Sequence, residues 1–145
     1  MHPYEFTVSL RIYHPNIDPD SITSKLGKTP KFAWRAGEPA ITPKGQELEG
    51  SRKTSYRCAE LSGGEPLYSG DIEIERFVLD SLSELSEFEN FFSEILTSGG
   101  KVECFVGLFG DRNLGILLDS NLIAELSELG VELALDYYPP QSDGT

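Results

Sequence analysis

The clearest pattern along the chain is an alternation of apolar and polar residues near each end. Close to the start, every second residue is apolar (Phe6, Val8, Leu10 and Ile12). Residues 131–136 repeat this alternation close to the end. Apolar side chains at every second position are typical of a strand with one face in the core. The pattern therefore predicts a strand near each end of the chain.

Two short helices are predicted from their capping residues. One follows Asp18, and the other begins at Asp119 or Ser120, because aspartate and serine cap the free N–H groups of a first helical turn. A glycine follows the last apolar residue of each helix, Gly27 in the first and Gly130 in the second. Glycine is typical there, since the residue after a helix often takes a left-handed conformation.

The middle of the chain contains the longest predicted helix. Between Phe77 and Leu96 the apolar residues recur every three or four positions, with acidic residues on the other faces. Strands are predicted at residues 31–35, 55–61 and 102–109. Residues 36–54 are rich in glycine and proline and are expected to be irregular.

These elements form two similar strand-helix-strand units, one at each end of the chain. Such pairs are the units of ferredoxin-like sheets. We therefore expect an α+β fold that is a ferredoxin-like variant: a mostly antiparallel sheet of about five strands with the helices packed on one face. Residues 1–139 are predicted to form a single domain, and residues 140–145 a disordered tail.

The charge of the chain restricts its partners. Its 24 acidic and 12 basic side chains give a net charge of −12. This charge disfavours nucleic acid and anionic membranes and favours a basic protein. No apolar run approaches the ~20 residues needed to cross a bilayer, and no signal peptide is recognised at the start, so a cytoplasmic location is expected. Cys58 and Cys104 are expected to be buried free thiols, a disulfide being the alternative if their strands are neighbours.

The basic residues are concentrated in one segment. Residues 25–57 contain eight basic and three acidic side chains, a net charge of +5, whereas the rest of the chain carries −17. Trp34, Arg35 and Arg52 of this segment are candidate ligand-binding residues, because guanidinium groups and an aromatic ring together suit an anion. The alternative is that these cations neutralise the acidic helix of the same molecule.

The long acidic helix is the candidate surface for a protein partner. Glu84, Glu87 and Glu94 are the residues through which we expect a basic protein to bind. The alternative is a solvated surface whose charge maintains solubility.

No catalytic constellation is recognisable. His2 and His14 are the only histidines, and His14, at the end of a strand, is expected to cap or to be exposed. Sequence motifs of hydrolases, metalloproteases and nucleotide-binding loops are absent. Asp111, Asp119 and Asp136 could assemble a metal site, but turns and helix capping explain the first two. We therefore predict no enzyme activity, no metal and no cofactor.

Several stretches of the sequence together resemble a known family. They are IDPDSITSKLGKTP (17–30), WRAGEP (34–39), the Arg52-Lys53-Thr54 approach to the next strand, and GDRNLGILLDSNLIAELSELGVELALDYYP (110–139). The chain resembles the bacterial domain of unknown function 4279 family over nearly its whole length. Tyr56 stands where such proteins often carry a tryptophan. The resemblance implies a shared fold and assigns no activity.

Two functions follow as hypotheses. The first is a non-enzymatic protein-binding module, for instance an immunity-type protein whose acidic surface blocks a basic toxin. The alternative is a sensor of a small anionic ligand that uses Trp34, Arg35 and Arg52. A homodimer formed through a sheet edge is a further possibility.

Overall fold

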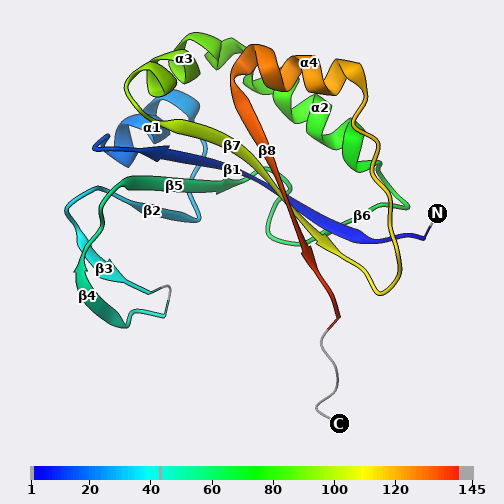
Figure 1. Cartoon of the computed structure of the whole chain (residues 1–145), viewed down its shortest axis with the longest axis horizontal. Coiled ribbons are helices and arrows are strands. Elements are labelled where there is room, and N and C mark those ends of the chain that lie inside the picture. The colour runs from blue at the N-terminus through cyan, green and yellow to red at the C-terminus, as the bar shows by residue number, and fades with distance from the viewer. Residues whose placement is uncertain (1, 43, 141–145) are drawn as a thin grey trace.

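A curved sheet with every α-helix on one of its faces forms the centre of the molecule (Figure 1). The structure is a computed structural model that describes residues 2–42 and 44–140. The tail predicted at residues 140–145 lies outside the described residues from residue 141 onward. Within the described ranges, none of the helices has the length and apolar content needed to cross a membrane.

The main sheet has six strands in an order that differs from the chain order. Five strands lie in the order β2-β5-β1-β7-β8, and β6 pairs with β1 beyond the end of β5. Their bounds are β1 (Glu5–His14), β2 (Phe32–Trp34), β5 (Ser55–Glu60), β6 (Leu67–Tyr68), β7 (Lys101–Phe109) and β8 (Val131–Tyr138). The helices are α1 (Pro19–Leu26), α2 (Ile74–Leu85), α3 (Glu89–Thr97) and α4 (Ser120–Leu129), with the 3₁₀ turn η1 (Ser86–Phe88) between α2 and α3.

The two strand-helix-strand units have different layouts. In the first unit β5 lies between β1 and β2, whereas in the second β7 and β8 are direct parallel neighbours. All other strand pairs of the sheet are antiparallel. The predicted α+β class and mostly antiparallel sheet are confirmed. The expected number of strands, about five, was wrong because the two-residue β6 adds a sixth, and the ferredoxin-like arrangement is not confirmed.

The predicted caps of the short helices are present. The Asp18 carboxylate accepts a backbone N–H of α1 at 3.0 Å, and the Asp119 carboxylate accepts one of α4 at 2.9 Å. Asp119 rather than Ser120 is therefore the cap of α4. Gly27 and Gly130 end these helices with φ of 72° and 69°, the left-handed region that glycine enters without a steric penalty.

The long helix predicted over residues 77–96 is in fact two helices. α2 ends at Leu85, and η1 separates it from α3. Leu82, Leu85 and Phe88 follow one another at intervals of three, which matches the three residues per turn of a 3₁₀ helix. The Ser86 hydroxyl also donates to the Ser83 carbonyl at 2.7 Å, a bond that competes with regular helix geometry.

The core lies between the sheet and the helices. Phe6, Val8, Leu10 and Ile12 point into it from β1 and are at most 1% exposed. Arg57 of β5 is also buried there, at 0% exposure. Its guanidinium donates to the Thr23 hydroxyl of α1 and to the Lys28 carbonyl, which follows the C-cap Gly27. Arg57 is therefore a structural residue and adds nothing to the exposed charge of the basic segment.

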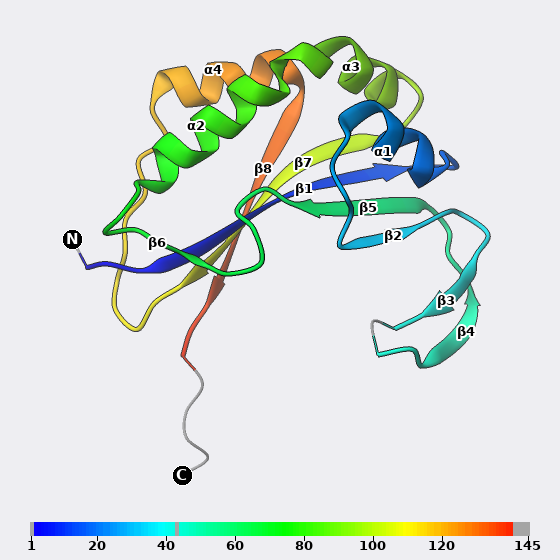
Figure 2. The same cartoon turned by 180° about the vertical axis from the view of Figure 1, so that it is seen from behind.

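The segment expected to be irregular contains a hairpin. Its strands β3 (Pro39–Ile41) and β4 (Glu47–Ser51) form a separate two-stranded sheet. Figures 1 and 2 show this hairpin curling under the face of the main sheet that the helices leave open. A cavity lies between the open face and the hairpin.

Both cysteines are buried and free, as predicted. Cys58 pairs with Arg11, whose side chain is on the open face, whereas Cys104 pairs with the core residue Leu10. The two thiols therefore belong to opposite faces of the sheet, which explains why they form no disulfide.

Candidate functional site

Aromatic and basic side chains meet on the open face where β2, β5 and β1 lie side by side. The strand register places Tyr13 opposite Tyr56, and Tyr56 opposite Trp34. Arg11 lies two residues before Tyr13 and so points to the same face. Three strands that are distant in sequence thus contribute to one surface.

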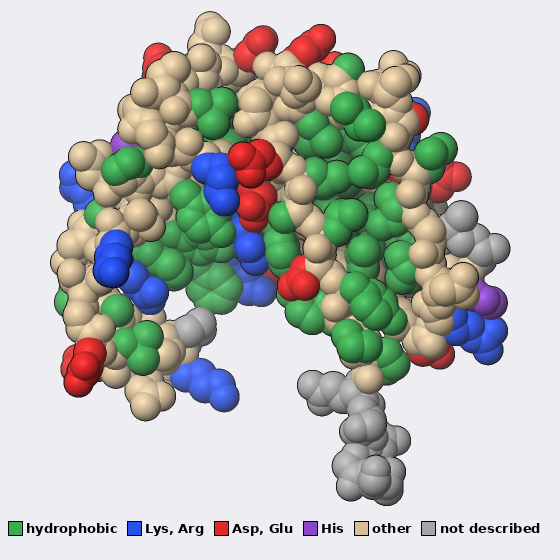
Figure 3. All heavy atoms as spheres, viewed as in Figure 1, with side chains coloured by type: hydrophobic (Ala, Val, Ile, Leu, Met, Phe, Trp, Pro, Cys, Tyr) green, Lys and Arg blue, Asp and Glu red, His purple; other side chains and the backbone are tan. Residues whose placement is uncertain are grey.

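The hairpin converts this surface into a groove. The cavity between them has a volume of about 400 Å³. The sheet contributes Arg11, Tyr13, Phe32, Trp34 and Tyr56, and the segment carrying the hairpin contributes Ile41, Thr42, Leu48 and Arg52. Figure 3 shows an apolar hollow beside the hairpin, bordered by Lys and Arg side chains. We call this cavity the aromatic groove.

The rings of the groove form a continuous cluster. The ring centroids of Trp34 and Tyr56 lie 4.6 Å apart, and those of Tyr56 and Tyr13 lie 5.0 Å apart. These separations are within the range of favourable aromatic contacts. Tyr56 is therefore the central ring, held from both sides.

Each arginine of the groove stacks on a ring. The Arg52 guanidinium lies 3.8 Å from the Trp34 ring centroid and donates to the Ile41 carbonyl. The Arg11 guanidinium lies 3.5 Å from the centroid of Phe105 and 3.5 Å from the Glu103 carboxylate. Both arginines keep a buried Nε for which the described residues provide no acceptor.

The groove is cationic in a chain of net charge −12. Its lining includes two guanidinium groups, and none of the described residues that line it is acidic. Burial, together with the neighbouring Cys58, raises the pKa of Tyr56, so its phenol keeps its proton at neutral pH. Burial alone would lower the pKa of Arg11, but the nearby Tyr56 and Tyr13 raise it, so the guanidinium stays charged. The groove therefore offers positive charge and hydrogen-bond donors next to aromatic surface.

A comparison with models of protein families gives a match to one described as Domain of unknown function (DUF4279), over residues 4–140. The chain belongs to this family. The resemblance noted from the sequence is confirmed, since the match covers nearly the whole chain. Searches of curated proteins and of solved structures found no match.

Two of the three ligand-binding residues predicted in this DUF4279 domain line the groove. Trp34 and Arg52 are in contact there. Arg35 lies outside it, where its half-exposed guanidinium is 3.7 Å from the Asp18 carboxylate. Arg11 and Tyr13 were not among the residues predicted from the sequence, although the alternation of β1 places both on the polar face of that strand.

His14 of the DUF4279 domain is a capping residue. Its imidazole is 8% exposed, and its Nδ1 accepts the backbone N–H groups of Asn16 and Ile17. No described carboxylate is bonded to it, since its Nε2 meets the Ser98 hydroxyl at 2.8 Å. Among residues 2–42 and 44–140, no three His, Cys, Asp or Glu residues are grouped so that they could hold a metal ion, so Asp111, Asp119 and Asp136 are not assembled into one.

The acidic residues predicted to bind a partner are on the outer surface of the helical layer. Glu84 belongs to α2, Glu87 to η1 and Glu94 to α3, and all three are exposed. Within the described part of the chain none of them forms an ion pair. They remain candidates for binding a basic partner.

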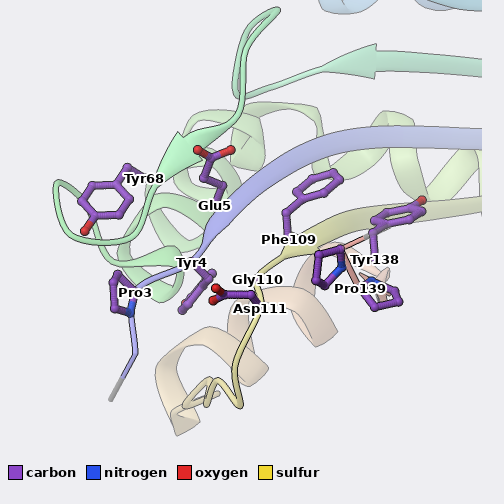
Figure 4. A pocket seen from close by; sticks show the side chains of 10 residues that line it. Pro3, Tyr4, Glu5, Tyr68, Phe109, Gly110, Asp111, Tyr138 and Pro139 are labelled. Carbon is purple, nitrogen blue, oxygen red and sulfur yellow. The ribbon is translucent and has the colours of Figure 1, made fainter. Parts of the chain in front are cut away.

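A second cavity of the DUF4279 domain, of about 610 Å³, lies at the other end of the open face. A row across four strands places Tyr68 opposite Glu5, Glu5 opposite Phe109, and Phe109 opposite Tyr138. The last two rings are stacked with their centroids 5.0 Å apart. In Figure 4 the side chains of Glu5, Phe109 and Tyr138 point to the same side of the sheet, and Asp111 follows from the next turn. We call this cavity the end pocket.

Proposed function

We propose that the protein is a non-enzymatic binding domain whose aromatic groove takes a small anionic ligand containing a planar ring. The observation that carries the proposal is the pairing of two arginines with an aromatic cluster in one cavity. This is the chemistry expected of the ligand sensor inferred from the sequence. Arg11 replaces Arg35 among the predicted ligand-binding residues.

The unsatisfied arginine atoms support an anionic ligand. The Nε atoms of Arg11 and Arg52 are buried and lack an acceptor among the described residues. A buried donor without a partner costs about 1–3 kcal/mol, and hydrogen bonds to charged groups are among the strongest. A carboxylate or phosphate in the groove would provide acceptor oxygens close to both guanidinium groups.

The rings support a planar ligand. Tyr13, Tyr56 and Trp34 line the groove together, and aromatic pairs contribute about 0.5–1.5 kcal/mol beyond the burial of their area. A volume of about 400 Å³ is within the range of small-molecule sites. Ile41 and Leu48 of the hairpin, which are 43% and 51% exposed, would then be covered by the ligand.

The single tryptophan of the chain provides the test, because its fluorescence reports on the groove alone. Four probes separate charge from ring: benzoate and phenyl phosphate carry both, benzamide has only the ring, and inorganic phosphate has only the charge. We expect saturable changes of fluorescence with benzoate or phenyl phosphate, with a Kd of about 1 mM or lower, and much weaker binding of the other two. Equal responses to benzoate and benzamide would contradict the proposal.

Two variants locate the effect. Arg52→Gln removes the charge over Trp34 and should weaken binding of the anionic probe about tenfold. Arg35→Gln is the matched control, since Arg35 is next to Trp34 in sequence but outside the groove, and its affinity should stay unchanged. If Arg35→Gln weakened binding and Arg52→Gln did not, the site would lie elsewhere.

A further inference from the structure

The outer edge of β8 is free to pair with another strand. β8 is the last strand on its side of the sheet, and among the described residues no strand pairs with its outer edge. A strand edge of this kind exposes backbone N–H and C=O groups that can pair with another chain. The C-terminal half of β8, residues 135–138, is exposed.

One face of this edge is apolar. Leu135 and Tyr137 lie on the helix side of the sheet and are 49% and 47% exposed. Ile123 of α4 and Leu118 of the preceding loop are also exposed, at 53% and 36%. Figure 3 shows a broad patch of hydrophobic side chains beside β8. Exposed apolar patches of this kind mark interaction surfaces.

The other face of the same edge is acidic. Glu132 and Asp136 alternate with the apolar residues and point to the open face of the sheet. Neither forms an ion pair with another described residue. Arg11 and Lys101 are the nearby cations of this face, and both are 3.5–3.6 Å from Glu103.

The end pocket continues the acidic face beyond Asp136. Tyr138, the last residue of β8, stacks on Phe109, and Glu5 and Asp111 add two carboxylates without ion-pair partners among the described residues. Stacked aromatic faces next to carboxylates suit an arginine or lysine side chain. Arg112, the cation nearest in sequence, does not line this pocket.

We propose that the edge of β8 binds an extended segment of another protein in which basic and apolar residues alternate. In such a strand the apolar side chains would cover Leu135 and Tyr137. The basic side chains would face Glu132 and Asp136, and the last of them would enter the end pocket. This interface is separate from the aromatic groove, and it identifies a different surface for a basic partner from the one formed by Glu84, Glu87 and Glu94.

A second copy of this chain would bring like charges together at this edge. Two antiparallel β8 strands paired about a twofold axis at Ala134 would place Glu132 of each copy opposite Asp136 of the other. Like charges directly opposite each other destabilise strand pairing. A net charge of −12 on each copy adds to the repulsion.

A peptide titration tests the proposal. The probe is a capped heptapeptide of alternating arginine and valine, and its control carries neutral citrulline in place of arginine. With the full ¹⁵N-labelled chain, we expect the arginine peptide to give saturable shifts of the backbone amides of β8 and of Gly110 and Asp111. The citrulline peptide should bind at least tenfold more weakly. Equal binding of the two peptides, or no saturable shift at about 5 mM peptide, would overturn the proposal.

Matched variants identify the surface. Glu132→Gln together with Asp136→Asn should weaken binding of the arginine peptide about fivefold, because both carboxylates are lost from the edge. Glu84→Gln together with Glu94→Gln is the control, with the same loss of charge on the helical layer, and should have little effect. The reverse result would assign the peptide to the helices. A concentration-dependent dimer closed through β8 would also overturn the proposal, since the edge would already be occupied.

Discussion

At the end of β1 the imidazole of His14 holds the turn that leads into α1. Its Nδ1 accepts the N–H groups of Asn16 at 3.1 Å and of Ile17 at 2.9 Å. An imidazole nitrogen that accepts two hydrogen bonds carries no proton, so Nε2 holds the proton and donates it to the Ser98 hydroxyl. Burial lowers the pKa of His14, and the neutral ring is the form that the folded chain requires.

His14 should make stability depend on pH. The unfolded chain binds a proton at this residue near pH 6.5, whereas the folded chain resists it, so stability is complete above about pH 6.5 and falls as the pH decreases toward the folded pKa. The limiting slope for one group is about 1.4 kcal/mol per pH unit. We expect the free energy of unfolding, measured in urea from about pH 7.5 to 5.5, to fall more steeply for the wild type than for His14→Gln. His2→Gln, which changes the exposed histidine, should follow the wild type, and identical slopes for all three would contradict this role.

Among the elements, α3 and β7 are joined by a turn that has no room for a side chain at Gly100. A Cβ there would lie 2.6 Å from the Tyr13 carbonyl oxygen and 2.9 Å from that of Ile95. Both contacts are with backbone, which cannot move without disturbing β1 or α3. The Gly100 N–H also donates to the Ile95 carbonyl at 2.8 Å, which fixes the turn.

We therefore expect Gly100→Ala to destabilise the domain by about 2–3 kcal/mol, since it forces atoms into a filled space. Gly64→Ala is the control, because that glycine has no positive φ and nothing lies within 4 Å of a Cβ built there. Thermal unfolding followed by circular dichroism measures both. Equal melting temperatures for the two variants would show that the turn is looser than the structure indicates.

Elements could be predicted from the sequence where local pattern and global packing agree. β1 alternates strictly and has one buried face, and α1 and α4 carry both an N-cap and a closing glycine. The β3–β4 hairpin could not be predicted in this way, since every residue of β4 is exposed and no alternation marks it. β6 has only two residues, too few for any pattern.

Only part of the aromatic groove could be predicted from the sequence, because local patterns do not show which strands pair. Trp34 and Arg52 belong to one basic segment, so composition singled them out together. Arg11 and Tyr13 join them only through the pairing of β1 with β5, which is a long-range fact that no local pattern records. Arg35 lies outside the groove because it follows Trp34, the last residue of β2, and its side chain turns toward Asp18.

Charge is distributed unevenly over the molecule: the helical layer is acidic, and on the open face the basic lining is confined to the aromatic groove. α2, η1, α3 and α4 together contain eight acidic side chains and one basic side chain, Arg76. On the opposite face the aromatic groove is lined by two arginines. Acidic side chains lie in the last turns of α2 and α3, where the helix dipole makes a negative charge unfavourable. No basic residue in either last turn offsets them. The acidic charge in these last turns therefore opposes stability.

This distribution of charge predicts that an acidic side chain raises or lowers stability according to its position in a helix. Salt should weaken the effect. Glu84 and Glu94 lie in the last turns of α2 and α3, so replacing both with glutamine should raise the melting temperature by about 2 °C in low salt. Glu89→Gln, in the first turn of α3, should lower it instead, because an acidic side chain is favourable there. Both differences should shrink in about 0.5 M NaCl, where charges separated by more than a few ångströms are screened. Melting curves at the two salt concentrations check this, and shifts of the same sign for both variants would mean that net charge alone, rather than its placement along the helices, determines stability.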